Sequence, residues 1–175
     1  MKKILILFVI FAALWAAGCR QKQEPTQQPG NQAPQAPSLL QMTLLQEAAK
    51  KTPKNPQAWI ALGNGMMDSQ RFDEAVKAYQ KALALQPKNV DVRVDLGTCY
   101  RGIGKFDKAV EEYRKALKIN PNHPNAHRNL GVVLASDLHK TAEGIKEFQK
   151  YLELAPNAPD AEAIRQAIQK MTAGQ

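Results

Sequence analysis

Histidine and cysteine are the residue types in this 175-residue chain that could support metal or nucleophilic chemistry, and they number three and two. His123 and His127 are four residues apart, the spacing at which two imidazoles on one helix face can hold a metal ion. Pro121 and Pro124, however, place His123 in a linker before the helix begins, and no adjacent cysteine or carboxylate completes a ligand set. We therefore expect no metal site and no cofactor.

Cys99 lies between Gly97 and Tyr100, where a small and weakly polar side chain is typical of core packing. No basic neighbour in the sequence is placed to lower the pKa of its thiol. The chain also has no glycine-rich phosphate loop, no serine nucleophile elbow and no Cys-x-x-Cys-His haem motif. The sequence therefore predicts a protein that is not an enzyme.

The second cysteine, Cys19, follows a segment with the profile of a signal peptide over residues 1–18. Two lysines precede an apolar run of fourteen residues, Ile4 to Ala17, which is shorter than the roughly 20 residues of a membrane-spanning helix. The residues Ala16-Ala17-Gly18-Cys19 resemble the lipobox of bacterial lipoproteins, although Ala16 stands where that motif usually has leucine. A plain signal peptide and an uncleaved amino-terminal anchor remain alternatives.

The lipobox resemblance implies that Cys19 carries a lipid and that the domain is held at a membrane of the bacterial envelope, in the periplasm. Arg20 follows the cysteine in place of aspartate, which favours the outer membrane over the inner one. Residues 20–37 contain six glutamines, four prolines and no large apolar side chain. Such a composition cannot bury enough surface to fold and predicts a flexible linker.

From residue 38 onward the sequence repeats with a period of 34 residues. The dipeptide Leu-Gly recurs at 62–63, 96–97 and 130–131, and Phe-Asp recurs at 72–73 and 106–107. The pattern resembles the tetratricopeptide repeat family, whose columns in the first copy are Trp59, Leu62, Gly63, Ala75, Tyr79, Ala82 and Pro87. The resemblance implies an all-α fold, a right-handed superhelix of tandem helical hairpins with a concave face.

The repeat divides the rest of the chain into a half-repeat helix (38–54), three hairpins (55–88, 89–122 and 123–157) and a capping helix (158–172). In the half-repeat, Leu45 and Ala48 fall in the columns of Tyr79 and Ala82. The third copy is one residue longer, and we place the extra residue in the turn over 136–141. The bulky Tyr151 predicts that this copy packs against the cap. No strands are expected.

The formal charge of +8 raises the question of nucleic-acid binding. Residues 38–175 contain twenty lysines and arginines against fifteen acidic residues, but the two signs are mixed along the helices. Lys50, Lys51 and Lys54 form the densest basic cluster, which allows a weak attraction to an anionic surface. With the expected export, this distribution excludes nucleic acid as a partner.

In the tetratricopeptide repeat architecture, the first helix of each hairpin lines the concave groove, which binds protein or peptide ligands. The candidate groove residues are Gln57, Ile60, Asn64, Met67, Asp68, Asp91, Val94, Asp95, Thr98, Arg101, Asn125, Arg128, Asn129 and Val132. Chaperone-binding members of the family clamp a peptide carboxylate with lysine and asparagine columns. Ile60 and Asp95 occupy two of those columns here, so a carboxylate clamp is not expected.

Two functional hypotheses follow from the anchor and the groove. In the first, the chain is a membrane-tethered interaction module that assists the assembly or stability of an envelope complex such as a pilus or secretin system. In the second, it is an adaptor that recruits or regulates an envelope enzyme, such as a cell-wall hydrolase or a cytochrome-maturation factor. The sequence identifies neither the partner nor the oligomeric state.

Overall fold

The computed structural model describes residues 36–173, and within this part of the chain every regular element is a helix. The all-α fold predicted from the repeat is therefore confirmed. The elements are α1 (Leu39–Lys51), α2 (Pro56–Asp68), α3 (Phe72–Leu85), α4 (Val90–Gly102), α5 (Phe106–Ile119), α6 (Pro124–Val132), a π-helical segment η1 (Val133–Asp137), α7 (Thr141–Leu154) and α8 (Ala161–Ala173). The predicted signal peptide, Cys19 and most of the linker lie outside the described residues.

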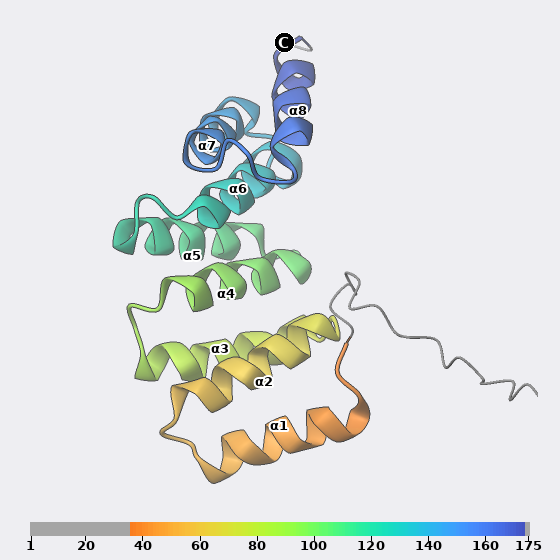
Figure 1. The fold of residues 1–175 in the computed structure, drawn as a ribbon, viewed down its shortest axis with the longest axis vertical. Helices are drawn as coiled ribbons and strands as arrows, with labels where there is room; N and C mark the ends of the chain where they lie inside the picture. The colour runs from red at the N-terminus through yellow and green to blue at the C-terminus, as the bar shows by residue number, and fades with distance from the viewer. Residues whose placement is uncertain (1–35, 174–175) are drawn as a thin grey trace, which may run out of the picture. The chain divides into compact units, whose positions relative to one another are not determined.

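The helices pair in chain order as three antiparallel hairpins, α2 with α3, α4 with α5 and α6 with α7. Each hairpin also packs on the next through its second helix, while α1 packs on α2 and α8 packs on α7 (Figure 1). Residues 34–175 are one compact unit, and both hydrophobic clusters are built from residues 42–171. This part of the chain therefore contains a complete core of its own.

The close approach of the two helices in each hairpin depends on a glycine facing an aromatic ring. A Cβ atom on Gly63 would lie 2.6 Å from the ring of Tyr79, and a Cβ atom on Gly97 would lie 2.6 Å from the ring of Tyr113. The third hairpin repeats the contact with Gly131 and Phe148, at 2.7 Å. Since real Cβ atoms do not approach so closely, any larger residue forces the helices apart.

The polar atoms at this seam change together from hairpin to hairpin. In the first hairpin the Tyr79 hydroxyl donates to Asn64 Oδ1 at 2.8 Å. In the second, the hydroxyls of Thr98 and Tyr113 are 3.2 Å apart. In the third, the corresponding pair is Val132 with Phe148, which is wholly apolar. A buried hydroxyl requires a hydrogen-bond partner. The third hairpin loses the hydroxyl and its partner at once.

A three-residue turn joins the helices of every hairpin, and its middle residue has a positive φ. These residues are Gln70 (φ 58°), Gly104 (φ 72°) and His139 (φ 54°). In the turns after α2 and α4, the backbone N–H of the last turn residue donates to a carbonyl five residues earlier, as from Arg71 to Met66 at 2.8 Å. This arrangement satisfies helix-terminal carbonyls that otherwise lack a donor.

The extra residue of the third repeat is not in the turn, where the sequence analysis placed it. The turn over 138–140 is as long as those over 69–71 and 103–105, whereas α6 and η1 together are one residue longer than α2 or α4. The π-helical segment absorbs the residue, with Leu138 N–H donating to Val133 O at 2.9 Å. The insertion therefore widens one helical turn and leaves the hairpin connection unchanged.

In the half-repeat helix α1, Leu45 of the Tyr79 column packs against the core, but Ala48 of the Ala82 column does not. Ala49 is fully buried, whereas Ala48, expected in the Ala82 column, is exposed. Within the described chain α1 has no first helix of its own to cover that column, and Leu40 and Leu44 are 69% and 57% exposed on α1. No helix described in the structure is long and apolar enough to span a bilayer.

We predict that Gly97→Ala destabilises the domain by about 1–3 kcal/mol, because the added methyl group collides with the Tyr113 ring. Urea unfolding followed by circular dichroism measures the loss. Combining Gly97→Ala with Tyr113→Leu tests the contact directly, since the smaller side chain leaves room for the methyl group. The double variant should lose less than the sum of the two single losses, and simple additivity would refute the contact.

Candidate functional site

The face formed by α2, α4 and α6 contains two neighbouring cavities that share Arg128 and Asn129. The larger, of about 690 Å³, is lined by Val94, Asp95, Pro124, Asn125, Arg128, Asn129, Tyr151, Ala155, Ala158, Pro159 and Asp160. The smaller, of about 300 Å³, is lined by Thr98, Arg101, Tyr113, Arg128, Asn129 and Val132. We call the two cavities together the groove. Its walls come from α4, α5, α6 and α7 and from the segment that leads into α8.

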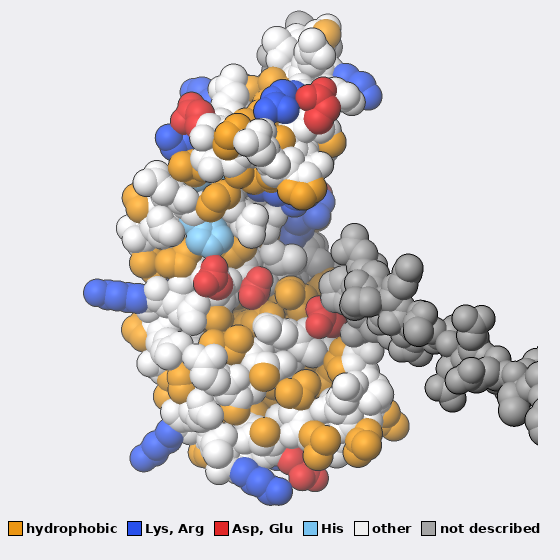
Figure 2. Space-filling view, viewed as in Figure 1, with side chains coloured by type: hydrophobic (Ala, Val, Ile, Leu, Met, Phe, Trp, Pro, Cys, Tyr) orange, Lys and Arg blue, Asp and Glu red, His pale blue; other side chains and the backbone are white. Residues whose placement is uncertain are grey.

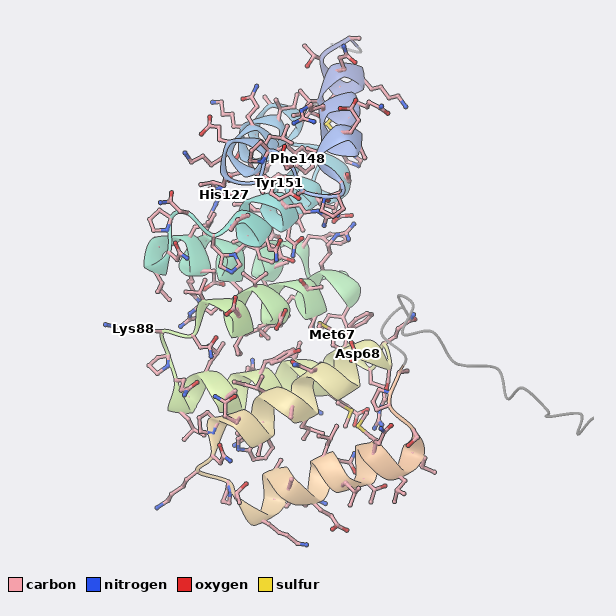
Figure 3. All side chains as sticks on the ribbon, in the orientation of Figure 1. Met67, Asp68, Lys88, His127, Phe148 and Tyr151 are labelled. Atoms are coloured by element: carbon pink, nitrogen blue, oxygen red, sulfur yellow. The ribbon has the colours of Figure 1, made fainter. Side chains whose placement is uncertain are left out.

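Eight of the predicted groove residues are brought together here, all from the second and third repeats: Val94, Asp95, Thr98, Arg101, Asn125, Arg128, Asn129 and Val132. The predicted residues outside the two cavities are Gln57, Ile60, Asn64, Met67, Asp68 and Asp91. Figure 3 shows Met67 and Asp68 side by side at the end of α2. The first repeat thus contributes nothing to these two cavities.

Two predicted groove residues have structural roles that the sequence did not reveal. Val94 is only 5% exposed and belongs to the hydrophobic core, so it forms the floor of the larger cavity and does not project into it. Asn64 uses its Oδ1 to accept the hydrogen bond from Tyr79. That acceptor is therefore not free for the backbone of a bound peptide.

Both arginines of the groove are paired with a carboxylate from a later element. Arg101 Nε lies 2.5 Å from Asp137 Oδ2, which joins the second repeat to the third. Arg128 pairs with Asp160, which joins the third repeat to the segment before α8. These pairs connect successive repeats along the groove and leave its cationic groups largely neutralised.

The polar side chain of Asn129 is also engaged between repeats. Its Nδ2 lies 3.4 Å from the Thr98 hydroxyl, and its Oδ1 lies 3.4 Å from Arg128 Nη1. Both distances are long for hydrogen bonds, so the amide is held weakly and can exchange partners. Asn125, by contrast, is exposed in the same cavity.

Asp95 is the groove carboxylate without a cationic partner among the described residues. Burial, with the nearby charge of Asp91, raises the pKa of Asp95 to about 6, although His123 acts in the opposite direction. Figure 2 shows acidic side chains gathered over α4 on the face that contains the groove. Asp95 is therefore a partly buried carboxylate that could accept hydrogen bonds from a ligand.

The groove residues contributed by α7 and the cap, above all Tyr151 and Asp160, were not predicted from the sequence. The Tyr151 hydroxyl donates to Asp160, and this bond together with Arg128 holds the pKa of the Asp160 carboxyl below its usual range. An aspartate just before an apolar helix is a helix-start signal, but nothing in the sequence indicates its pairing with Arg128, 32 residues earlier. The expectation that Tyr151 packs against the cap is confirmed, since Tyr151 is buried with Ile164 of α8.

The two histidines considered as metal ligands make structural contacts instead. His123 caps α6 by accepting from Ala126 N–H at Nδ1 (3.1 Å), which leaves Nε2 to donate to Asp91 at 2.9 Å. His127 lies 2.6 Å from Glu147 and 2.8 Å from the Pro121 carbonyl (Figure 3). Within residues 36–173 no three histidine, cysteine or acidic side chains are grouped as a metal site would require.

Cys99 is fully buried in the core, as the sequence analysis expected. Burial, with a further contribution from Asp95, raises the pKa of the Cys99 thiol to about 12. The reactive form of cysteine is the thiolate. At neutral pH this side chain therefore packs and does not react.

The family model of the tetratricopeptide repeat matches residues 66–131. Similar solved structures include a crystal structure of MamA (20% identity, TM-score 0.69, covering 76% of this chain and 75% of that one) and the Arabidopsis OM64 TPR domain (20% identity, TM-score 0.62, covering 72% and 98%). A third is the first TPR of Spaghetti (RPAP3) bound to the HSP90 peptide SRMEEVD (24% identity, TM-score 0.62, covering 68% and 91%). No curated protein sequence matches the chain.

At these identities the solved structures show a shared fold and no shared ligand. The family match spans the end of α2, the whole of the second repeat and the first helix of the third. The helices on either side continue the same stacking of hairpins. Residues 66–131 therefore contain tetratricopeptide repeats, and the neighbouring helices share their hairpin architecture.

Proposed function

We propose that the groove binds an extended segment of another polypeptide and that the domain is held at a bacterial envelope membrane by a lipid on Cys19. Tetratricopeptide repeats are scaffolds for protein–protein interaction. The observation that carries the proposal here is the pair of adjoining cavities along α4 and α6, which mix apolar walls with polar groups. Such a surface suits a peptide that offers alternating apolar and hydrogen-bonding groups.

The charges of the groove favour a particular ligand chemistry. Arg101 and Arg128 already have carboxylate partners, whereas Asp95 has none among the described residues. A lysine or arginine side chain, or a cluster of N–H donors, would satisfy Asp95. We infer that the bound segment is basic near this point. The peptide carried by the RPAP3 domain ends in an acidic residue, so the ligand of this groove is of a different kind.

The anchor proposal is supported by the residues around Cys19, which lie outside the described residues. The linker over 20–37 would separate a membrane-bound cysteine from the groove. A tethered groove of this kind suits the assembly or stability of an envelope complex such as a pilus or secretin system. An adaptor for an envelope enzyme is the alternative, and the identity of a captured partner distinguishes the two.

We predict that Asp95→Asn makes the domain more stable than the wild type, and that this difference in unfolding free energy grows as the pH rises from about 4 to 6. Because burial raises the pKa of Asp95 to about 6, the folded state keeps a proton in this window that the unfolded state has released. Raising the pH therefore costs the wild type stability that the variant keeps. Urea unfolding at pH 4.5, 5.5 and 7 measures the difference, with Asp107→Asn on α5 as the exposed control. Parallel pH profiles for wild type and Asp95→Asn would contradict the assignment.

We predict that Asn125→Trp abolishes partner capture, because the indole fills the larger cavity from an exposed position that makes few structural contacts. The measurement is a pulldown from detergent-solubilised membranes followed by mass spectrometry. Lys118→Trp, which introduces the same indole at an exposed site of α5 outside the groove, should retain the partner. Capture that survives Asn125→Trp would show that the partner binds elsewhere.

We predict that Cys19→Ser prevents acylation and cleavage before residue 19. The hydroxyl is a far weaker nucleophile than the thiolate that forms the thioether to the lipid. Mass spectrometry of the purified chain reads the modification, and membrane fractionation reads the anchor. An unmodified Cys19 with an intact amino terminus in the wild type would instead favour an uncleaved anchor.

A further inference from the structure

In each hairpin one residue of the first helix faces one residue in the middle of the second helix. The types of these two residues differ among the three repeats. In the second hairpin Arg93 Nη1 lies 2.9 Å from Glu112 Oε2, and in the third His127 Nδ1 lies 2.6 Å from Glu147 Oε2. The corresponding residues of the first hairpin are Trp59 and Ala78. The second and third hairpins thus place a carboxylate at this point. The first hairpin has only a methyl group there.

The first member of each pair keeps a second, constant role. Trp59 Nε1 donates to the Pro53 carbonyl at 2.9 Å, Arg93 Nη2 donates to the Pro87 carbonyl at 2.7 Å, and His127 Nε2 lies 2.8 Å from the Pro121 carbonyl. All three side chains therefore tie the hairpin to the linker before it. Trp59 preserves this contact but carries no charge, so the ion pair of the other hairpins cannot form.

An open cavity of about 350 Å³ lies beside Trp59 and Ala78, between α1, α2 and α3. Its apolar wall consists of Trp59, Leu62, Met66 and Ala78. In the second hairpin the Met66 position is taken by Tyr100, whose ring lies under the Lys108 ammonium at 5.7 Å and whose hydroxyl accepts from Gln80 at 3.0 Å. Met66 and Ala78 are smaller than their counterparts Tyr100 and Glu112, which leaves this space free.

The charges around the cavity are mainly positive. Lys50, Lys77 and Lys81 line it, and none of the three is in an ion pair with another described residue. The acidic side chain in the wall, Glu74, is held by both Nε and Nη2 of Arg71, at 2.6 and 2.7 Å. In the second hairpin the counterpart of Lys81 is Lys115, which lies 2.8 Å from Glu112. The lysine at this position is thus kept where Glu112 has been lost, and Lys77 adds a cation where the second hairpin has Glu111.

We propose that this cavity binds a carboxylate carried on an apolar body, supplied by a second molecule in place of the missing glutamate. The carboxylate would lie among the three lysines, and the apolar part would cover Trp59 and Met66. A medium-chain fatty acid and a glutamate between apolar residues of a peptide both have this chemistry. The cavity shares no lining residue with the groove, so the site stands independently of the proposed function.

The test uses residues 34–175, which form a compact unit with Trp59 as their sole tryptophan. Tryptophan fluorescence is followed while sodium decanoate is added below its micellar concentration, with decylammonium as the matched cation. A second titration uses a blocked peptide with one glutamate between leucines, with the glutamine peptide as its control. We expect saturable binding of decanoate or of the glutamate peptide, and the one that binds identifies the source. Absence of binding by both, or equal binding of the matched controls, overturns the proposal.

Variants locate the carboxylate. Ala78→Glu restores the glutamate of the other hairpins and should abolish binding, because it supplies the anion internally. Lys77→Gln and Lys81→Gln, both at exposed sites, should each weaken binding about two- to five-fold. Their counterparts in the third repeat, Lys146→Gln and Lys150→Gln, should leave it unchanged. Unaltered binding in both the Lys77 and the Lys81 variants would overturn the assignment even if Ala78→Glu fails to fold.

Discussion

The contact between a glycine and an aromatic ring is the constraint on which the rest of this domain depends. Gly63, Gly97 and Gly131 permit an approach that no side chain allows, and each faces a ring from the second helix of its hairpin. Repetition of one contact fixes one helix-pair geometry, and stacking equal units places successive first helices on the same face. The groove is a consequence of this repetition, since its residues reach it from different helices at corresponding positions.

Corresponding positions explain both the success and the failure of prediction from the sequence. The 34-residue period reveals the helices and the seam, because these depend on contacts that recur in every unit. Ala48 keeps the residue type of its column but is exposed, because α1 occupies a terminal position and lacks the helix that would cover this column. The π-helical turn over 133–137 was misplaced for a related reason: a length difference shows that a residue was added, but only packing decides which turn widens.

The groove was predicted less completely than the fold, because its chemistry depends on contacts between repeats. The columns identify which side chains of α4 and α6 share a face, and eight of them do line the cavities. They do not reveal that Arg128 pairs with Asp160 or that Arg101 pairs with Asp137. Partners more than 30 residues apart leave no periodic signal. What remains after these pairs form, the charge of Asp95, is a property of the folded groove alone.

Repeats that share a backbone need not share the means of holding it. The linker carbonyl before each hairpin accepts from an indole, a guanidinium or an imidazole, and the linker before α8 is bonded by Arg165 to Pro156 O at 2.8 Å. Arg165 lies nine residues after its proline, whereas the other three donors lie six residues after theirs. The four linkers thus share a hydrogen bond to this carbonyl and not the identity of its donor. That freedom allows one hairpin to exchange an internal ion pair for a tryptophan beside an open cavity without altering the stack.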